Sequence, residues 1–245
     1  MAEIINKNLH NIVILLNEPR YPGNIGASAR CLKNMGFSKL RIVNPLNWDQ
    51  DKILKMATHE ASDIIHAAEI FNDLESAVKD LHLLAGTTAR TGRKRYPTHT
   101  PQTIAPKILS YPSDIKIGIL FGSEKWGLKN REIGLCNWIV TIPTANFSSL
   151  NLAQSVMILC YELFLATKNE PVKIQIPRLA SLQEREGMFR HLQEVFRVIG
   201  LYEKQTPAYW LQNARRFFRN KELTAKDVKM IRGFLRQILW AVRHG

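Results

Sequence analysis

Runs of apolar, often β-branched residues alternate with helix-compatible segments over the first two thirds of the chain. The strand-like runs lie at residues 11–16, 40–43, 81–85, 115–121 and 138–142. Such alternation predicts an α/β fold with a mostly parallel sheet flanked by helices. The first helix is expected to start near Asn24 and to end at Gly36, because glycine commonly follows the last helical turn.

Helical periodicity dominates the rest of the chain, apart from one interruption. An apolar helix at 152–166 is followed by Pro171 and Pro177, which favour a non-helical passage. Helices are then predicted at 179–199, 208–218 and 224–243, the last with a start signal formed by Thr224 and Asp227. We therefore expect one domain over residues 1–168 and a small all-helical extension over 169–245.

Polar, glycine-containing segments follow three of the strand-like runs, at residues 18–30, 121–128 and 142–151. In an open parallel sheet, ligands bind outside the carboxyl ends of the strands. Three such segments are therefore expected to meet at one site.

The first segment contains Gly23 and Gly26. It lacks the third glycine of a dinucleotide fingerprint and the Gly-Lys-Ser/Thr of a phosphate-binding loop, which disfavours nicotinamide and ATP chemistry. One interpretation is that both glycines only permit a tight backbone turn. The other is that Asn24 and Arg30 bind phosphate or ribose, since arginine presents a planar fork of donors.

The second and third segments each combine polar side chains with a strand end. Glu124 stands between two glycines, which would let a ligand approach the backbone, although a lone glutamate is also typical of an exposed loop. Ser148, Ser149 and Asn151 open directly into the apolar helix. They offer donors and acceptors for a ligand, and the alternative is that Ser149 is only the N-cap of that helix.

The 245 residues carry a formal net charge of +13, and residues 171–245 hold 15 Lys and Arg against 6 Asp and Glu. This asymmetry favours a polyanionic partner, nucleic acid rather than a membrane, over a basic surface kept only for solubility. A further polar segment follows the strand-like run 81–85. It contains Arg90, then Arg93, Lys94 and Arg95, and then Tyr96. This group suits RNA phosphates and an unpaired base, or equally a solvated loop.

Three widely spaced cysteines suggest neither a disulfide framework nor a zinc site, and the seven histidines show no metal-binding spacing. We therefore expect no metal and a reducing, cytoplasmic location. The first ten residues lack the apolar core of a signal peptide, and the longest apolar stretch, 150–166, is shorter than the roughly 20 residues of a membrane span. No membrane association is expected.

The three segments in this order resemble the ribose 2′-O-methyltransferases of the knotted SPOUT superfamily, over about residues 10–166. The resemblance rests on three sequence motifs. They are Pro-Gly-Asn-Ile-Gly-Ala-x-Ala-Arg, Phe-Gly-x-Glu-x-x-Gly-Leu, and Ile-Pro-Thr followed by Ser-Leu-Asn-Leu-Ala. The chain is most similar to bacterial members that methylate the ribose of nucleotide 32 in the tRNA anticodon loop. One departure is Ser123, where relatives commonly have arginine, and it bears on substrate choice.

This resemblance implies a deep trefoil knot, a homodimer, tRNA as partner and S-adenosylmethionine as cofactor. The cofactor would lie bent in the knot and be held largely by backbone. On this sequence the implied cofactor contacts are Thr87, Thr88, Ala89, Gly122, Gly127, Ile142, Ser148, Ser149 and Leu150.

The same resemblance implies Arg30 as the principal catalytic residue, facing the partner subunit's cofactor, with Asn24, Glu124, Ser149 and Asn151 arranging the site. Arg30 would also contact RNA. A guanidinium is effectively always protonated. We therefore expect Arg30 to fix a phosphate and stabilise the developing alkoxide, while a transiently neutral arginine, a water or a phosphate oxygen takes the proton.

Three other functions stay open at this point. In the first, the protein methylates a ribose at another tRNA position or in ribosomal RNA. In the second, it binds RNA without catalysis. In the third, it methylates a base. The glycines of the second segment and Asn151 speak against loss of catalysis, and base methyltransferases of this superfamily carry different motifs.

Overall fold

The computed structural model describes residues 9–90, 97–168, 177–201, 206–219 and 221–244. Its centre is a six-stranded, fully parallel sheet in the order β3-β2-β1-β5-β4-β6. The strands are β1 Ile12–Asn17, β2 Leu40–Val43, β3 Glu69–Phe71, β4 Leu83–Thr87, β5 Ile117–Phe121 and β6 Trp138–Val140. The predicted fold class, a parallel α/β sheet followed by helices, is confirmed.

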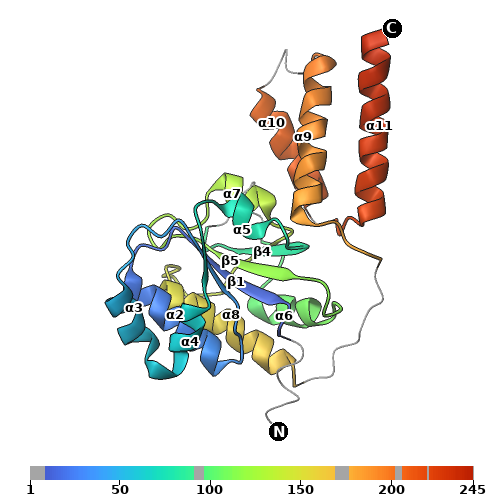
Figure 1. Cartoon of the computed structure of the whole chain (residues 1–245). Coiled ribbons are helices and arrows are strands. Elements are labelled where there is room, and N and C mark those ends of the chain that lie inside the picture. The colour runs from blue at the N-terminus through green and yellow to red at the C-terminus, as the bar shows by residue number, and fades with distance from the viewer. Residues whose placement is uncertain (1–8, 91–96, 169–176, 202–205, 220, 245) are drawn as a thin grey trace.

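Helices cover the two faces of the sheet unequally (Figure 1). The larger core lies under α2 Pro22–Asn34, α3 Gln50–Ala57, α4 Ser62–His66, α6 Pro101–Leu109 and α8 Leu152–Ala166. The other face carries α5 Leu74–Val78 and α7 Asn130–Leu135, and Leu182 packs into the same core. Because both faces are covered, the central strands read as continuous apolar runs, as in β1, which is buried along its whole length.

The sequence analysis missed β3. This strand has three residues, Glu-Ile-Phe, at the edge of the sheet, and the Ile70 side chain is 53% exposed. A short edge strand with one covered flank lacks the apolar run that identified the other five. A short 3-10 helix at His59–Ala61 also precedes α4.

Helix α2 begins two residues before the predicted start. Tyr21 is its N-cap and Pro22 stands in the first turn, where the missing amide hydrogen costs nothing. The predicted end is confirmed, because Gly36 has a φ of +78° just after the helix. Gly26 brings α2 against α3, since a Cβ at Gly26 would lie 2.0 Å from the carbonyl oxygen of Ile53.

The chain leaving β6 contacts both ends of the connection from β4 to α6. On one side, the Thr88 amide donates to the Val140 carbonyl and the Thr141 hydroxyl donates to the Thr88 carbonyl. On the other side, the Thr141 amide donates to the carbonyl of His99, and His99 forms a parallel bridge with Val140. Thr88 and His99 lie near the two ends of the connection from β4 to α6, so the chain leaving β6 contacts both ends of this connection, an arrangement in keeping with the predicted knot.

The C-terminal helices are α9 Leu182–Val198, α10 Pro207–Phe218 and α11 Ala225–His244, close to the predicted ranges. The predicted start signal is confirmed, since the Asp227 amide donates to the Thr224 hydroxyl and the Thr224 amide to the Asp227 carboxylate. No helix in the described ranges is long and apolar enough to cross a membrane. The predicted boundary at 168/169 borders residues 169–176, outside the described residues, and stays a prediction.

These helices dock at the amino ends of the strands. The Leu182 amide donates to the Leu81 carbonyl just before β4. Buried Arg185 donates to the side-chain oxygen of buried Asn137 just before β6, at 2.9 Å. The same oxygen accepts from the Leu84 amide at 3.1 Å, so Asn137 joins α9 to the sheet.

We expect Gly26→Ala to destabilise the protein by about 1–3 kcal/mol, because the added Cβ would overpack the α2–α3 contact. Gly23→Ala is the matched control. Its Cβ would meet only the Cγ of Met56 at 3.4 Å, and alanine favours a helix over glycine. Urea unfolding measures both variants, and equal stability of Gly26→Ala and wild type would refute the packing role.

Candidate functional site

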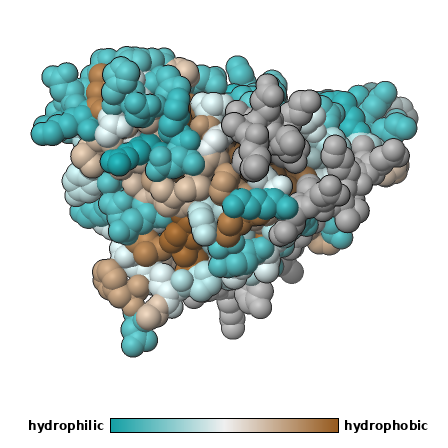
Figure 2. Space-filling view, turned by 90° about the horizontal axis from the view of Figure 1, so that it is seen from below, coloured by the Kyte–Doolittle hydropathy of each residue, from teal (hydrophilic) through white to brown (hydrophobic). Residues whose placement is uncertain are grey.

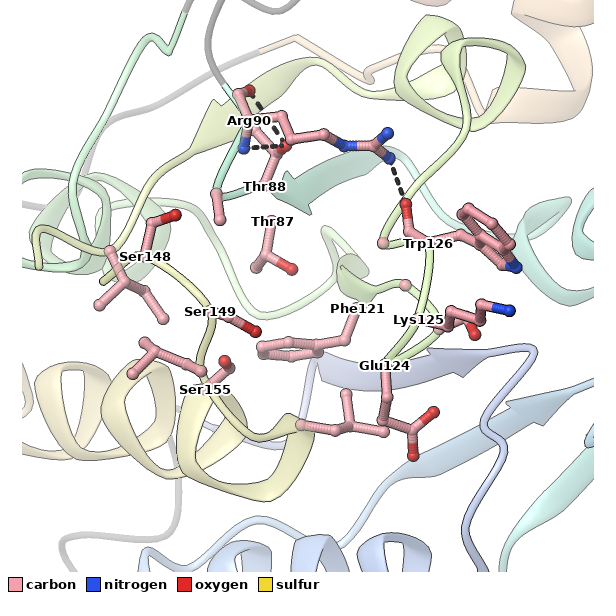
Figure 3. A pocket seen from close by; sticks show the side chains of 17 residues that line it. Thr87, Thr88, Arg90, Phe121, Glu124, Lys125, Trp126, Ser148, Ser149 and Ser155 are labelled. Atoms are coloured by element: carbon pink, nitrogen blue, oxygen red, sulfur yellow. Dashed lines mark hydrogen bonds between the residues drawn. The ribbon is translucent and has the colours of Figure 1, made fainter. Parts of the chain in front are cut away.

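A cavity of about 300 Å³ lies at the carboxyl ends of β4 and β5, beside the chain that follows β6 (Figure 3). Its size falls in the range of about 300–1,000 Å³ common for small-molecule pockets. The structure brings every predicted cofactor contact into its wall. These are Thr87, Thr88, Ala89, Gly122, Gly127, Ile142, Ser148, Ser149 and Leu150.

Further residues line the cavity that were not predicted as cofactor contacts. They are Arg90, Phe121, Ser123, Glu124, Lys125, Trp126, Leu152 and Ser155. Most of them fall within or directly beside the three predicted segments, so a prediction extended to whole segments would have included them. Ser155 lies one turn inside α8, where the apolar character of the helix hid it.

The loop between β5 and α7 is closed on itself. The Gly127 amide donates to the Ser123 carbonyl at 2.7 Å, and Gly127 has a φ of +56°, in the region that favours glycine. A Cβ on Gly122 would lie 2.2 Å from the carbonyl carbon of Gly127. Both glycines are therefore needed for the turn that forms one wall of the cavity.

The residues at the carboxyl end of β4 and just after it connect three strand ends. The Thr87 hydroxyl donates to the Leu120 carbonyl of β5 at 3.1 Å, while Thr88 binds the chain at the end of β6. The Arg90 guanidinium donates to the carbonyl of Trp126 (Figure 3) and also to that of Leu128. Arg90, predicted as an RNA contact, thus binds the neighbouring loop in this structure.

Asn24, Glu124 and Asn151 form one hydrogen-bond network across the three segments. The Asn151 amide nitrogen donates to the Asn24 side-chain oxygen at 2.9 Å, and the Asn24 nitrogen donates to Glu124 at 2.8 Å. The Glu124 carboxylate also accepts from the backbone amides of Arg20 and Tyr21. Glu124 is therefore a partner of the first segment, not the freely solvated charge considered above.

The N-cap of α8 is Asn151. Its side-chain oxygen accepts from the amides of Ala153 and Gln154. The alternative that Ser149 is only an N-cap is therefore wrong. Ser149 lies two residues before the cap, is exposed, and lines the cavity.

Arg30 lies in α2, is exposed, and does not line the cavity of its own chain. Within the described ranges its guanidinium has no hydrogen-bond or ion-pair partner. It is thus free to meet a ligand or another molecule. Arg93, Lys94 and Arg95, predicted to bind RNA, lie outside the described residues.

The donor set of the cavity fits S-adenosylmethionine. Apolar Phe121, Ile142 and Leu152 suit a purine ring, while backbone groups and serine hydroxyls suit its polar edges and an amino-acid group. The Ser123 hydroxyl is buried and has no hydrogen-bond partner among the described residues, so it can serve a bound molecule.

Comparisons with known proteins agree with this geometry. The SpoU rRNA methylase family model matches residues 11–161, and the model of the C-terminal domain of tRNA methyltransferase TrmJ matches residues 183–245. A tRNA (cytidine/uridine-2′-O-)-methyltransferase TrmJ from Sodalis glossinidius is 33% identical, over 94% of this chain and 92% of the relative.

Two further matches extend over nearly the whole chain. The tRNA (cytidine/uridine/adenosine-2′-O-)-methyltransferase TrmJ of Pseudomonas aeruginosa is 31% identical, over 93% of each protein. The crystal structure of TrmJ from Z. mobilis ZM4 superposes with a TM-score of 0.81 at 28% identity, over 93% of this chain and 98% of that one.

Two substitutions of Asn151 separate its capping role from its role in the network. Asn151→Ala loses both and should cost about 1 kcal/mol of stability. Asn151→Asp keeps the cap, since aspartate caps as well as asparagine, but it loses the amide that donates to Asn24.

We expect both variants to lose methyl-transfer activity, by roughly 10²-fold if the site shifts by about 1 Å, while only the alanine variant melts earlier. Thermal unfolding and transfer of labelled methyl groups measure the two effects. If Asn151→Asp had wild-type activity, the hydrogen bond from Asn151 to Asn24 would not be needed for catalysis, and Asn151 would act only as the helix cap.

Proposed function

The chain belongs to the SpoU rRNA methylase family, and from this premise we propose that it methylates a ribose 2′-hydroxyl of tRNA with S-adenosylmethionine as donor. The observation that carries the proposal is the cavity lined by the second and third segments, to which the first segment is joined by the hydrogen bonds of Asn24 with Glu124 and Asn151. The match of residues 183–245 to the C-terminal domain of a tRNA methyltransferase favours tRNA over ribosomal RNA. We infer nucleotide 32 of the anticodon loop as the target, because the sequence motifs resemble those of the bacterial enzymes that methylate this nucleotide.

We propose that the nine cofactor contacts named above hold the donor through backbone groups. When bound, S-adenosylmethionine would supply the methyl group of its sulfonium to the ribose oxygen, with S-adenosylhomocysteine as the leaving group. The protein's share of the reaction is mainly orientation, and the network of Asn24, Glu124 and Asn151 keeps the walls of the cavity in register. Ser149 lines the cavity at the point where the chain enters α8.

The ionisable side chains among the described lining residues are Arg90, Glu124 and Lys125. Glu124 already accepts three hydrogen bonds from the first segment, so we assign it a positioning role and not that of a base. Arg30 is proposed to fix an RNA phosphate and to stabilise the developing alkoxide as a permanent cation. The proton then leaves to water or a phosphate oxygen.

We propose a homodimer formed through the outer face of α8. A helix that is apolar on all sides is normally covered on all sides. The side of α8 turned from its own core carries Ile158, Tyr161 and Leu165, and Tyr161 is 45% exposed. Seen from the side of α2 and α8, the surface has a hydrophobic area bordered by hydrophilic residues (Figure 2). A partner on this face would bring its cavity towards Arg30 of the first subunit.

The basic C-terminal helices are proposed to supply phosphate affinity, together with Arg93, Lys94 and Arg95. On this division, residues 1–168 carry the chemistry and residues 169–245 hold the tRNA. A tRNA substrate also favours a cytoplasmic location.

We expect tritium from labelled S-adenosylmethionine to enter unmodified tRNA with the wild type and to fall about 10²- to 10³-fold with Arg30→Ala. Lys33→Ala is the matched control, because Lys33 is exposed on the same helix and pairs with Asp63. Nucleoside mass spectrometry and primer extension then identify the product and its position. Equal labelling by Arg30→Ala and wild type would remove Arg30 from catalysis, and a methylated base would overturn the proposed reaction.

Tyr161→Glu tests the dimer. A carboxylate buried in an apolar interface is costly, so we expect dimer affinity to weaken by about 100-fold or more. Ile70→Glu on the edge strand β3 is the control, since Ile70 is also exposed, at 53%, but lies on another element. Sedimentation equilibrium reports both, and an unchanged dimer in Tyr161→Glu would place the interface elsewhere.

A further inference from the structure

An exposed tryptophan stands at the rim of the cavity. Trp126 lines the cavity, yet its side chain is 56% exposed, and its ring projects outward beside Lys125 (Figure 3). Large aromatic side chains gain most by burial, and an exposed one next to a ligand cavity suits contact with a further molecule. The nine proposed cofactor contacts do not include it.

The backbone that carries this ring is fixed in advance. The Arg90 guanidinium donates to the carbonyl of Trp126 and to that of Leu128, and the turn is closed by the hydrogen bond from Gly127 to Ser123. Guanidinium hydrogen bonds are stronger than those of neutral donors. Trp126 therefore presents its indole from a rigid loop, so little backbone entropy is lost when a partner binds.

The surroundings of the ring are cationic. The Lys125 ammonium lies 4.7 Å from the centre of the Trp126 ring, and within the described ranges it has no carboxylate partner. A flat aromatic surface beside a cation that lacks a carboxylate partner matches a nucleotide, in which a flat base adjoins a phosphate. A protein partner with an apolar surface would leave this ammonium without a counter-charge.

We propose that Trp126 is a stacking platform for an unpaired RNA base next to the ribose that receives the methyl group, with Lys125 on the adjoining phosphate. This inference rests on the proposed function, because it takes the RNA to be the substrate at the same cavity. Proteins recognise single-stranded RNA by stacking splayed bases on aromatic rings. Stacking accepts any base, so the platform supplies position and affinity rather than base choice. Arg90 acts as a positioning residue through its two carbonyl contacts.

The test compares Trp126→Leu, which removes the ring, with Trp126→Phe, which keeps a smaller one. The RNA is an unmodified tRNA transcript with 2-aminopurine beside the nucleotide that the wild type methylates. We expect Trp126→Leu to weaken RNA binding by about 5- to 100-fold and to lose the fluorescence quenching of 2-aminopurine, while Trp126→Phe keeps most of both. The dissociation constant for S-adenosylmethionine, measured by calorimetry without RNA, should stay within twofold.

Trp48→Leu is the matched control. Trp48 lies between β2 and α3, is 38% exposed, and does not line the cavity, so its RNA affinity should equal that of the wild type. RNA affinity and quenching unchanged in Trp126→Leu would overturn the platform. A loss confined to S-adenosylmethionine binding would also overturn it, since the ring would then serve the cofactor.

The outcome is separable from that of the proposed function. If the wild type binds tRNA but transfers no methyl group, the proposed function fails, and 2-aminopurine placed at each loop position in turn still reports whether Trp126 stacks a base. If the wild type is active and Trp126→Leu matches it in RNA affinity and rate, only the platform fails.

Discussion

The site depends on the path that the chain takes after β6. Hydrogen bonds hold Val140 and Thr141 between Thr88 on one side and His99 on the other. This confinement forces residues 142–150 across the carboxyl ends of β4 and β5, where they close the cavity. A free loop of the same length would pay conformational entropy each time a ligand bound, whereas a confined one has paid it on folding.

Much of this arrangement could be predicted from the sequence, because its signals are local. Apolar runs located five of six strands, and the apolar helix was predicted with the bounds that α8 has. Because ligands bind outside the carboxyl ends of parallel strands, the sequence also predicted that the three polar segments meet. The cofactor contacts themselves came from a family resemblance, and their roles await experiment.

Other features could not be predicted because they depend on contacts between distant residues. Nothing near Gly26 in the sequence indicates that its hydrogen faces the carbonyl of Ile53. Arg90 stands in a run of cations that suits RNA, yet it binds two carbonyls more than 30 residues away. Serine and asparagine are both good N-caps, so the sequence alone could not decide between Ser149 and Asn151. In the structure Asn151 is the cap, and its side chain also contacts Asn24, 127 residues away.

The cations around the cavity divide into two groups by what they already bind. Arg90 is bound to backbone carbonyls, and Lys129 pairs with Glu18 at 2.7 Å, so both are used in holding loops. Within the described residues Arg30 and Lys125 have no carboxylate partner, and binding a phosphate would cost them no existing ion pair. The fold thus holds the cavity through backbone and amide contacts, and leaves Lys125 in the cavity wall and Arg30 on α2 without ion pairs among the described residues. A polyanion is the partner that such cations favour, because each phosphate it binds releases counterions without breaking the contacts that shape the cavity.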